Sequence, residues 1–202
     1  MEVVSYPHLP AELSRAYIAL YTSVTNAGAL RKRIINAASM QGREGEDERE
    51  AVNYAFVDPR LITSPLHVKT AVLQAVMAQA QGALRTKTVH SEVLWALNPS
   101  NNISEAIRRY GVSEACTALL VVRVDGSALE PADVERKMGA AVQGQLVPLT
   151  QLGRLTDWVA VKKCHKLNNE LALKVCGQDG ERERAVIDNI VVSSVAMKSV
   201  MG

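Results

Sequence analysis

Residues 85–112 gather polar side chains of several kinds within a short length of chain. The cations Arg85 and Lys87 can meet phosphate groups. The adjacent Asn101 and Asn102, together with the free backbone amides of the helix predicted to follow them, can hydrogen-bond a phosphate or the edge of an unpaired base. These residue types therefore predict a binding site for the end of a single-stranded RNA.

The same segment also has a purely structural interpretation. Ser100 and Asn101 are residue types that cap helices, and Arg108 and Arg109 fit a solvated helix face. Composition and spacing alone leave both interpretations open.

The sequence lacks the motifs of common catalytic and metal sites. It contains no glycine-rich nucleotide loop, no GxSxG motif and no HExxH motif. The four histidines, at positions 8, 67, 90 and 165, have no metal-ligand spacing, and Cys116 opens an apolar segment typical of a packed core thiol. We therefore predict no catalytic residue, no metal and no cofactor.

Three alternatives from other function classes stay open. A small α/β enzyme with an unrecognised acid–base site would use Glu92, His90 and Lys87. A structural interaction module would have no connection with RNA. A DNA-binding helix-turn-helix formed by residues 90–112 is disfavoured, because the core needs the apolar residues of that segment.

The composition is that of a folded protein without a strong overall charge. The chain has 202 residues, of which 48% are hydrophobic, and a formal net charge of +2, so any RNA contact has to be local. Aromatic residues make up only 4%, which disfavours stacking of several bases. The odd count of three cysteines argues against a disulfide framework, and no segment resembles a signal peptide or a membrane span. We expect a protein of the nucleus and cytoplasm.

Apolar runs alternate along the chain with amphipathic segments, which predicts an α/β (α+β) fold. We expect a single compact domain over residues 1–202, with a small central mixed sheet of about four to five strands flanked by helices. The predicted strands lie near residues 15–21, 53–58, 116–124 and 156–168, and the third is apolar enough for a central position. Two charged stretches, residues 41–50 and 175–184, are predicted to be flexible loops.

Residues 91–106, with the preceding RTKT, carry the pattern S-E-x-x-x-x-L-x-P-x-N-N-I-S-E-A, which is long and unusual. It resembles the signature of the PRPK-binding protein (TPRKB) or Cgi-type family, a subunit of the KEOPS (EKC) complex. Weaker agreement extends over most of the chain: N-A-G-x-L-R at residues 26–31, V-D-P at 57–59 and V-K-K-x-x-K-L at 161–167.

The resemblance implies membership of an assembly that installs threonylcarbamoyl on the tRNA adenosine next to the anticodon. It implies a non-catalytic α/β subunit that binds the small atypical kinase/ATPase of the complex (Bud or PRPK type) and the 3′ CCA tail of tRNA, with other subunits contacted indirectly. It implies neither a membrane nor a small-molecule substrate. A telomere role, suggested for relatives, is left open.

The family pattern also points to individual residues of this chain. For the tRNA tail they are Arg85, Lys87, Ser91, Asn101, Asn102 and Ile103. For the kinase they lie in the last predicted helix, whose apolar surface is wider than one core-facing stripe needs: Ile187, Ile190, Val191, Ser194, Val195 and Met197.

Overall fold

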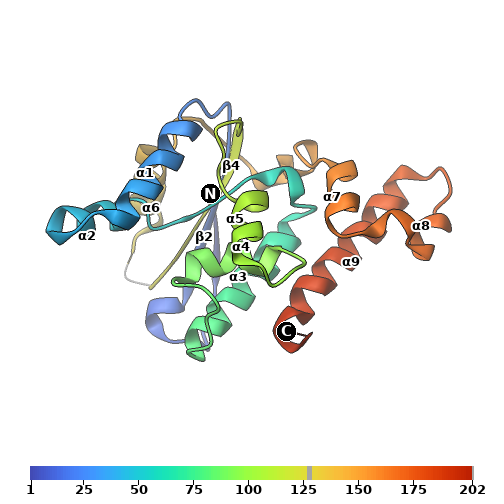
Figure 1. Cartoon of the computed structure of the whole chain (residues 1–202), viewed down its shortest axis with the longest axis horizontal. Helices are drawn as coiled ribbons and strands as arrows, with labels where there is room; N and C mark the ends of the chain where they lie inside the picture. The colour runs from blue at the N-terminus through green and yellow to red at the C-terminus, as the bar shows by residue number, and fades with distance from the viewer. Residues whose placement is uncertain (127–128, 202) are drawn as a thin grey trace.

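The computed structural model describes residues 1–126 and 129–201 and contains a five-stranded sheet with helices on both faces (Figure 1). The strands are β1 (Glu2–Ser5), β2 (Arg15–Thr22), β3 (Ala55–Val57), β4 (Ala118–Asp125) and β5 (Gln145–Val147). Their order is β1-β2-β4-β3, and β5 pairs with β2 on the edge that β1 also occupies. The predicted α+β class is confirmed. The pairings are all antiparallel, however, so the expected mixed sheet was wrong in that detail.

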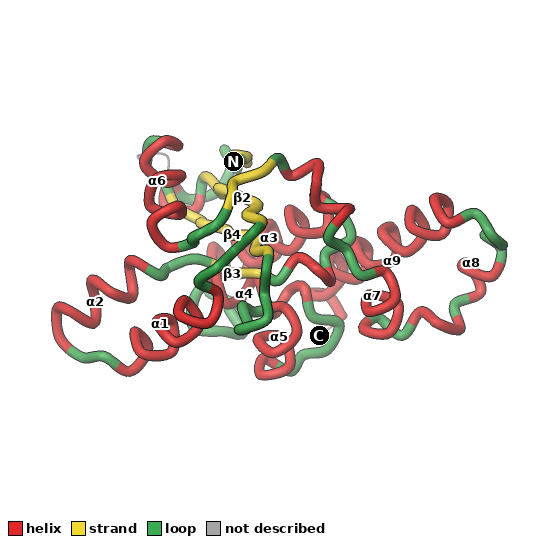
Figure 2. Tube along the Cα trace, turned by 90° about the horizontal axis from the view of Figure 1, so that it is seen from above, coloured by secondary structure: helices red, strands yellow, loops and turns green. Residues whose placement is uncertain are grey.

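The helices lie on the two faces of the sheet and at both ends of the molecule (Figure 2). They are α1 (Ala27–Ser39), α2 (Gly42–Ala51), α3 (Pro65–Ala80), α4 (Val89–Leu97), α5 (Ile103–Tyr110), α6 (Pro131–Ala141), α7 (Trp158–Cys164), α8 (Leu171–Lys174) and α9 (Gly180–Met201). Figure 2 shows the α1–α2 hairpin projecting at one end and α7, α8 and α9 at the other. Among the described residues, no helix combines the length and apolarity that crossing a membrane requires.

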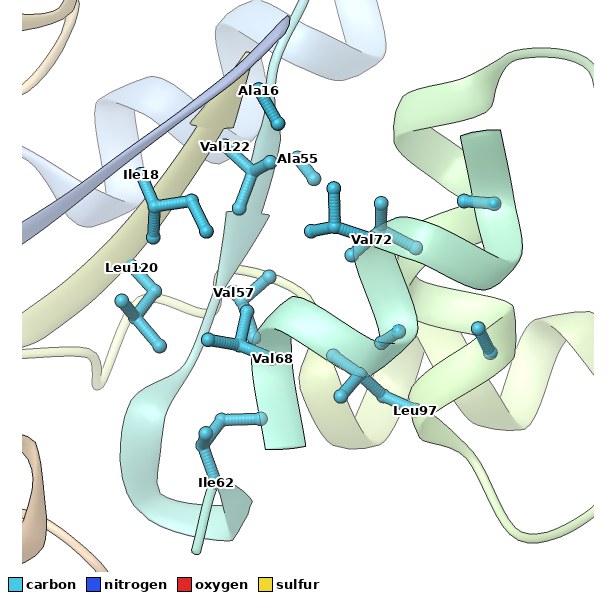
Figure 3. Close-up of a cluster of buried hydrophobic side chains, with 14 of the residues drawn as sticks. Ala16, Ile18, Ala55, Val57, Ile62, Val68, Val72, Leu97, Leu120 and Val122 are labelled. Atoms are coloured by element: carbon cyan, nitrogen blue, oxygen red, sulfur yellow. The ribbon is translucent and has the colours of Figure 1, made fainter. Parts of the chain in front are cut away.

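The central strands are apolar on both faces because helices cover each face. Side chains alternate across a strand, so Ile18 and Leu20 of β2 face α3 and α4, while Tyr17 and Ala19 face α1 and α6. Figure 3 shows the first cluster, where Val72 of α3 packs against the strand residues. The apolar run of β4 therefore lies at the centre, as its sequence predicted.

Residues 41–50, predicted as a flexible loop, lie mostly in helix α2. Charged residues stabilise this helix without a large apolar face: Arg33 of α1 and Glu48 form an ion pair, with Nη2 and Oε2 2.9 Å apart. Arg49 donates to the carbonyl oxygen of Met40 at 2.8 Å. Gly45 packs so close to that carbonyl oxygen that a Cβ would lie 2.7 Å from it. The prediction failed because it assumed that order requires apolar burial.

Two other predictions fail for a local reason, helix capping. Residues 175–184 do not form one loop, because α9 already begins at Gly180 and the Asp179 side chain accepts a hydrogen bond from the Arg182 backbone at 3.0 Å. The expected strand near residues 156–168 contains helix α7, capped by Asp157, which accepts from the Ala160 backbone at 3.0 Å. In both segments a carboxylate cap outweighs the apparent strand or loop pattern.

Candidate functional site

The α4–α5 segment forms a helix–loop–helix whose ends are fixed by polar side chains. Thr88 caps α4 and forms a capping box with Ser91. Asn102 caps α5, and its Oδ1 accepts from the Glu105 backbone at 3.0 Å. Leu97 of α4 is fully buried in the core, so the loop between the two helices is carried on a rigid base.

A cavity of about 250 Å³ lies beside this loop and is lined by Arg85, Trp95, Asn101 and Ile103. We call these four residues the Trp95 site. The Trp95 indole N–H donates to the carbonyl oxygen of Asn101 at 3.4 Å, which joins the aromatic ring to the loop. Arg85 and Asn101 are exposed, and the Ile103 side chain is 39% exposed.

Glu92 fixes the backbone turn at Arg85, on one side of the site. Glu92 is 1% exposed, and its carboxylate accepts from the backbone of Arg85 at 3.1 Å and from the backbone and hydroxyl of Thr86 at 2.8 and 2.6 Å. A buried carboxylate is stable only when its oxygens are hydrogen-bonded in this way. Glu92 therefore holds the turn that presents the Arg85 guanidinium, rather than presenting a free acid.

Asn98 and Lys198 fix the opposite side, at the loop. Asn98 is fully buried, and its amide donates to the carbonyl oxygen of Ser100 at 3.1 Å. The Lys198 ammonium, from α9, donates to the same carbonyl at 3.1 Å and also to the carbonyl oxygens of Trp95 and Asn98. It lies 3.9 Å from the centre of the Trp95 ring. Burial lowers the pKa of Lys198 to about 8, and the charge of Glu92 opposes that shift.

Two further cavities share residues with the Trp95 site. One, of about 370 Å³, is lined by Asn101 together with His165 and with Ser194 and Lys198 of α9. The other, of about 180 Å³, is lined by Arg85 and Trp95 and again by Lys198. The Trp95 site and one flank of α9 therefore lie on a single hollowed surface.

The structure brings three of the six residues predicted for the tRNA tail into one cavity: Arg85, Asn101 and Ile103. Asn102 is their neighbour in the chain, but its side-chain oxygen is used in the α5 cap. This outcome combines the two interpretations of the asparagine pair, since one asparagine caps and the other lines the cavity.

The remaining two predicted residues lie outside the lining of that cavity. Ser91 Oγ accepts from the Thr88 backbone N–H at 3.1 Å, and its single hydroxyl hydrogen can be donated to Thr86 Oγ1 at 3.0 Å or to the Thr88 carbonyl oxygen at 2.9 Å, so it stabilises the start of α4. Lys87 is exposed in the turn before α4. From this position the Lys87 ammonium could reach the phosphates of an RNA that extends beyond the cavity.

The predicted kinase-binding residues divide into two groups on α9. Ile187, Val191 and Val195 are 1%, 0% and 2% exposed and belong to the chain's own core, so their assignment as direct contacts is corrected. The other three follow spacings of four and three residues, which place them on one flank of the helix: the half-buried Ile190 and the exposed Ser194 and Met197. We call these three residues the α9 stripe.

The alternative acid–base site is not assembled by this fold. Val124 donates its backbone N–H to His90 Nε2 at 3.0 Å, so Nδ1 carries the proton that is shared with Asn53 Oδ1 at 2.9 Å. Burial, with a smaller contribution from the nearby Arg123 charge, lowers the pKa of His90 to about 3. The Glu92 carboxylate accepts its hydrogen bonds from the turn at Arg85 and Thr86, whereas His90 bonds to Asn53 and Val124. Within the described residues, no group of His, Cys, Asp or Glu side chains could hold a metal ion.

Sequence reasoning missed Trp95, Asn98 and Lys198. Trp95 lies inside the motif and is one of two tryptophans in the chain, which was a usable signal. No feature of the sequence could have identified Asn98 and Lys198, because their contacts depend on where α9 crosses the loop. The cavity itself is lined by Arg85, Trp95, Asn101 and Ile103, which supply one cation, one amide and an apolar wall and suit an unpaired nucleotide.

Comparison with known proteins agrees with the family resemblance of the motif. The family model described as "Kinase binding protein CGI-121" matches residues 21–199. A Cryptococcus neoformans protein named "EKC/KEOPS complex subunit CGI121" is 32% identical over 96% of this chain and 100% of its own length. Proteins of the same name from Gibberella zeae and Neurospora crassa are 33% and 30% identical over 99% of both chains. The chain therefore belongs to the CGI-121 family of kinase-binding proteins.

Proposed function

We propose that this chain is a non-catalytic subunit of a KEOPS-type assembly, in which it binds a small kinase and the 3′ tail of tRNA. The kinase partner is supported by the description of the family and by relatives named as subunits of the EKC/KEOPS complex. In this proposal the assembly modifies the tRNA adenosine next to the anticodon with threonylcarbamoyl, and another subunit performs the chemistry.

The observation that carries the tRNA part is the Trp95 site. Arg85 supplies a cation for a phosphate, the Asn101 amide supplies a donor and an acceptor for a base edge, and Ile103 with Trp95 supplies apolar contact area. The cavity, of about 250 Å³, is too small for a duplex and is open at the surface. An unpaired tail is the nucleic-acid element that matches both its size and its chemistry.

The α9 stripe is the proposed kinase surface. Met197 is 48% exposed, and Ile190 and Ser194 extend the same flank along the helix. An apolar helix flank of this kind fits a groove on a partner, where one or two well-packed side chains carry most of the binding energy. The core-facing residues of α9 serve this surface indirectly by fixing the helix on α3.

Reconstitution from purified components tests this function. The chain, the small kinase of its own assembly and tRNA should elute together from a size-exclusion column, because the two ligands use different residues. Loss of tRNA from the chain when the kinase is added would contradict separate surfaces. Failure of the chain and the kinase to associate at micromolar concentration would overturn the kinase assignment.

A further inference from the structure

Lys198 contacts the two parts of the molecule to which different ligands have been assigned. It belongs to α9, three residues after Val195 and next to Met197 of the α9 stripe. Its ammonium is hydrogen-bonded to three carbonyl oxygens between Trp95 and Ser100, in the loop that carries Asn101. The side chain is only 8% exposed, so these contacts are made inside the protein.

The contacts of Lys198 bring a cation to carbonyl oxygens at and just beyond the end of helix α4, where the Trp95 carbonyl also accepts from the Asn98 backbone N–H at 3.2 Å. The last carbonyls of a helix have no partner within it and carry partial negative charge, which a cation stabilises. Here the cation comes from another helix, because Lys198 follows Trp95 by 103 residues in the chain. The position of the loop is therefore set by the position of α9.

The Trp95 ring is the second point of contact. The Lys198 ammonium lies over the ring, 3.9 Å from its centre, and the indole N–H of the same ring donates to the carbonyl oxygen of Asn101 at 3.4 Å. A shift of Lys198 changes the environment of the ring and of the loop together. Ser194, one turn earlier in α9, lines the same 370 Å³ cavity as Asn101.

We infer that Lys198 is a positioning residue for the Trp95 site and couples binding at the α9 stripe to binding of an RNA tail. The inference rests on the proposed function. A partner on the stripe restrains α9, and α9 restrains the loop through Lys198, so the tail binds to a loop that is already ordered. Such coupling is reciprocal: the partner raises the affinity for the tail by the same factor as the tail raises the affinity for the partner.

The test measures the dissociation constant of a short RNA ending in CCA, with the chain alone and with the chain saturated by its kinase. We expect the kinase to tighten RNA binding at least about fivefold in the wild-type chain. Lys198→Met keeps the aliphatic stem but removes the charge. It should weaken RNA binding and bring the ratio of the two dissociation constants, without and with the kinase, close to one. Lys32→Met, on the exposed face of α1 at the far end of the molecule, is the control for the loss of one positive charge.

A second measurement leaves Lys198 in place. In a Trp158→Phe chain labelled with 5-fluorotryptophan, Trp95 gives the only fluorine signal, and kinase binding should shift it. An unshifted signal, or an unchanged ratio in a folded Lys198→Met chain, would overturn the inference while leaving the proposed function intact. If the wild-type chain, alone and with its kinase, binds no tail RNA, the proposed tRNA function fails and the coupling fails with it.

Discussion

Asn102 accepts a hydrogen bond from the backbone N–H of Glu105 at 3.0 Å, whereas the neighbouring Asn101 lines the Trp95 site. Two adjacent residues of the same type therefore have different tasks. The side chain of Asn101 has no hydrogen-bond partner in the part of the chain that the structure describes, so it is available to a ligand. This division separates binding from stability in the experiments that follow.

Asn101→Ala should weaken binding of tRNA without destabilising the fold. Loss of one hydrogen bond to a base edge costs about 1 kcal/mol, or roughly fivefold in Kd, while the free energy of unfolding should change by less than about 0.5 kcal/mol. Titration with tail RNA and urea unfolding measure the two quantities.

Asn102→Ala should show the reverse pattern, because removal of an N-cap costs about 1 kcal/mol of stability. Asn102→Ser retains a capping oxygen and should recover most of that loss. If Asn101→Ala unfolds the chain as readily as Asn102→Ala, the loop is only structural.

Arg85 should contribute one phosphate contact. Neutralising it in Arg85→Ala should reduce the slope of log K against log salt concentration by about 0.7, the value for one contact with a single strand. Filter binding of tail RNA across a salt series measures the slope. An unchanged slope would show that the guanidinium does not meet the phosphate backbone, and the same series on Lys87→Ala tests the residue that lies outside the cavity.

Met197→Glu should weaken kinase binding by at least about tenfold, because it places a charge in an apolar contact. Asn189→Glu adds the same charge on a different, exposed face of α9 and should have little effect. Calorimetric titration with the kinase compares the two variants. Equal affinities of both variants would contradict the assignment of the α9 stripe.

His90 should make the fold less stable in mild acid. Its pKa is lowered to about 3 in the folded chain, mainly by burial, so the unfolded chain binds a proton that the folded chain does not between about pH 6.5 and pH 3. The contribution is present above pH 6.5 and is lost as the pH falls. Between pH 7 and pH 5 this one group should remove about 2 kcal/mol.

Urea unfolding at the two pH values tests this expectation with His90→Gln, whose side chain does not titrate. The variant should lose less stability than the wild type over the same interval. His67, whose pKa is also lowered to about 3, should account for part of the remaining pH dependence. Identical pH dependence of variant and wild type would show that His90 is not buried in its neutral form.

Much of the sheet and of the loop chemistry could be predicted from local patterns. The apolar run from Ala118 onward identified the central strand, and the N-N-I-S-E pattern located the start of α5. Both features depend on neighbouring residues, which sequence reasoning handles well. The short strands β1 and β5 escaped prediction because three or four residues at a sheet edge carry little pattern.

The contacts that complete the candidate site could not be predicted in the same way. A lysine near the end of an amphipathic helix is typical of a solvated residue, and Lys198 becomes a buried donor only because α9 packs along α3 and crosses the loop. The prediction that Val191 contacts the kinase was wrong for a related reason. An apolar helix face does not reveal whether it covers the chain's own core or a partner. Long-range packing decides both.

The most direct test of the account compares tRNA with and without its three terminal nucleotides, CCA, in the presence of the kinase. We predict that removing CCA weakens binding at least about tenfold, and that Asn101→Ala weakens binding of intact tRNA but not of the shortened tRNA. Equal affinity of the chain for both tRNAs would contradict the assignment of the Trp95 site to the tail.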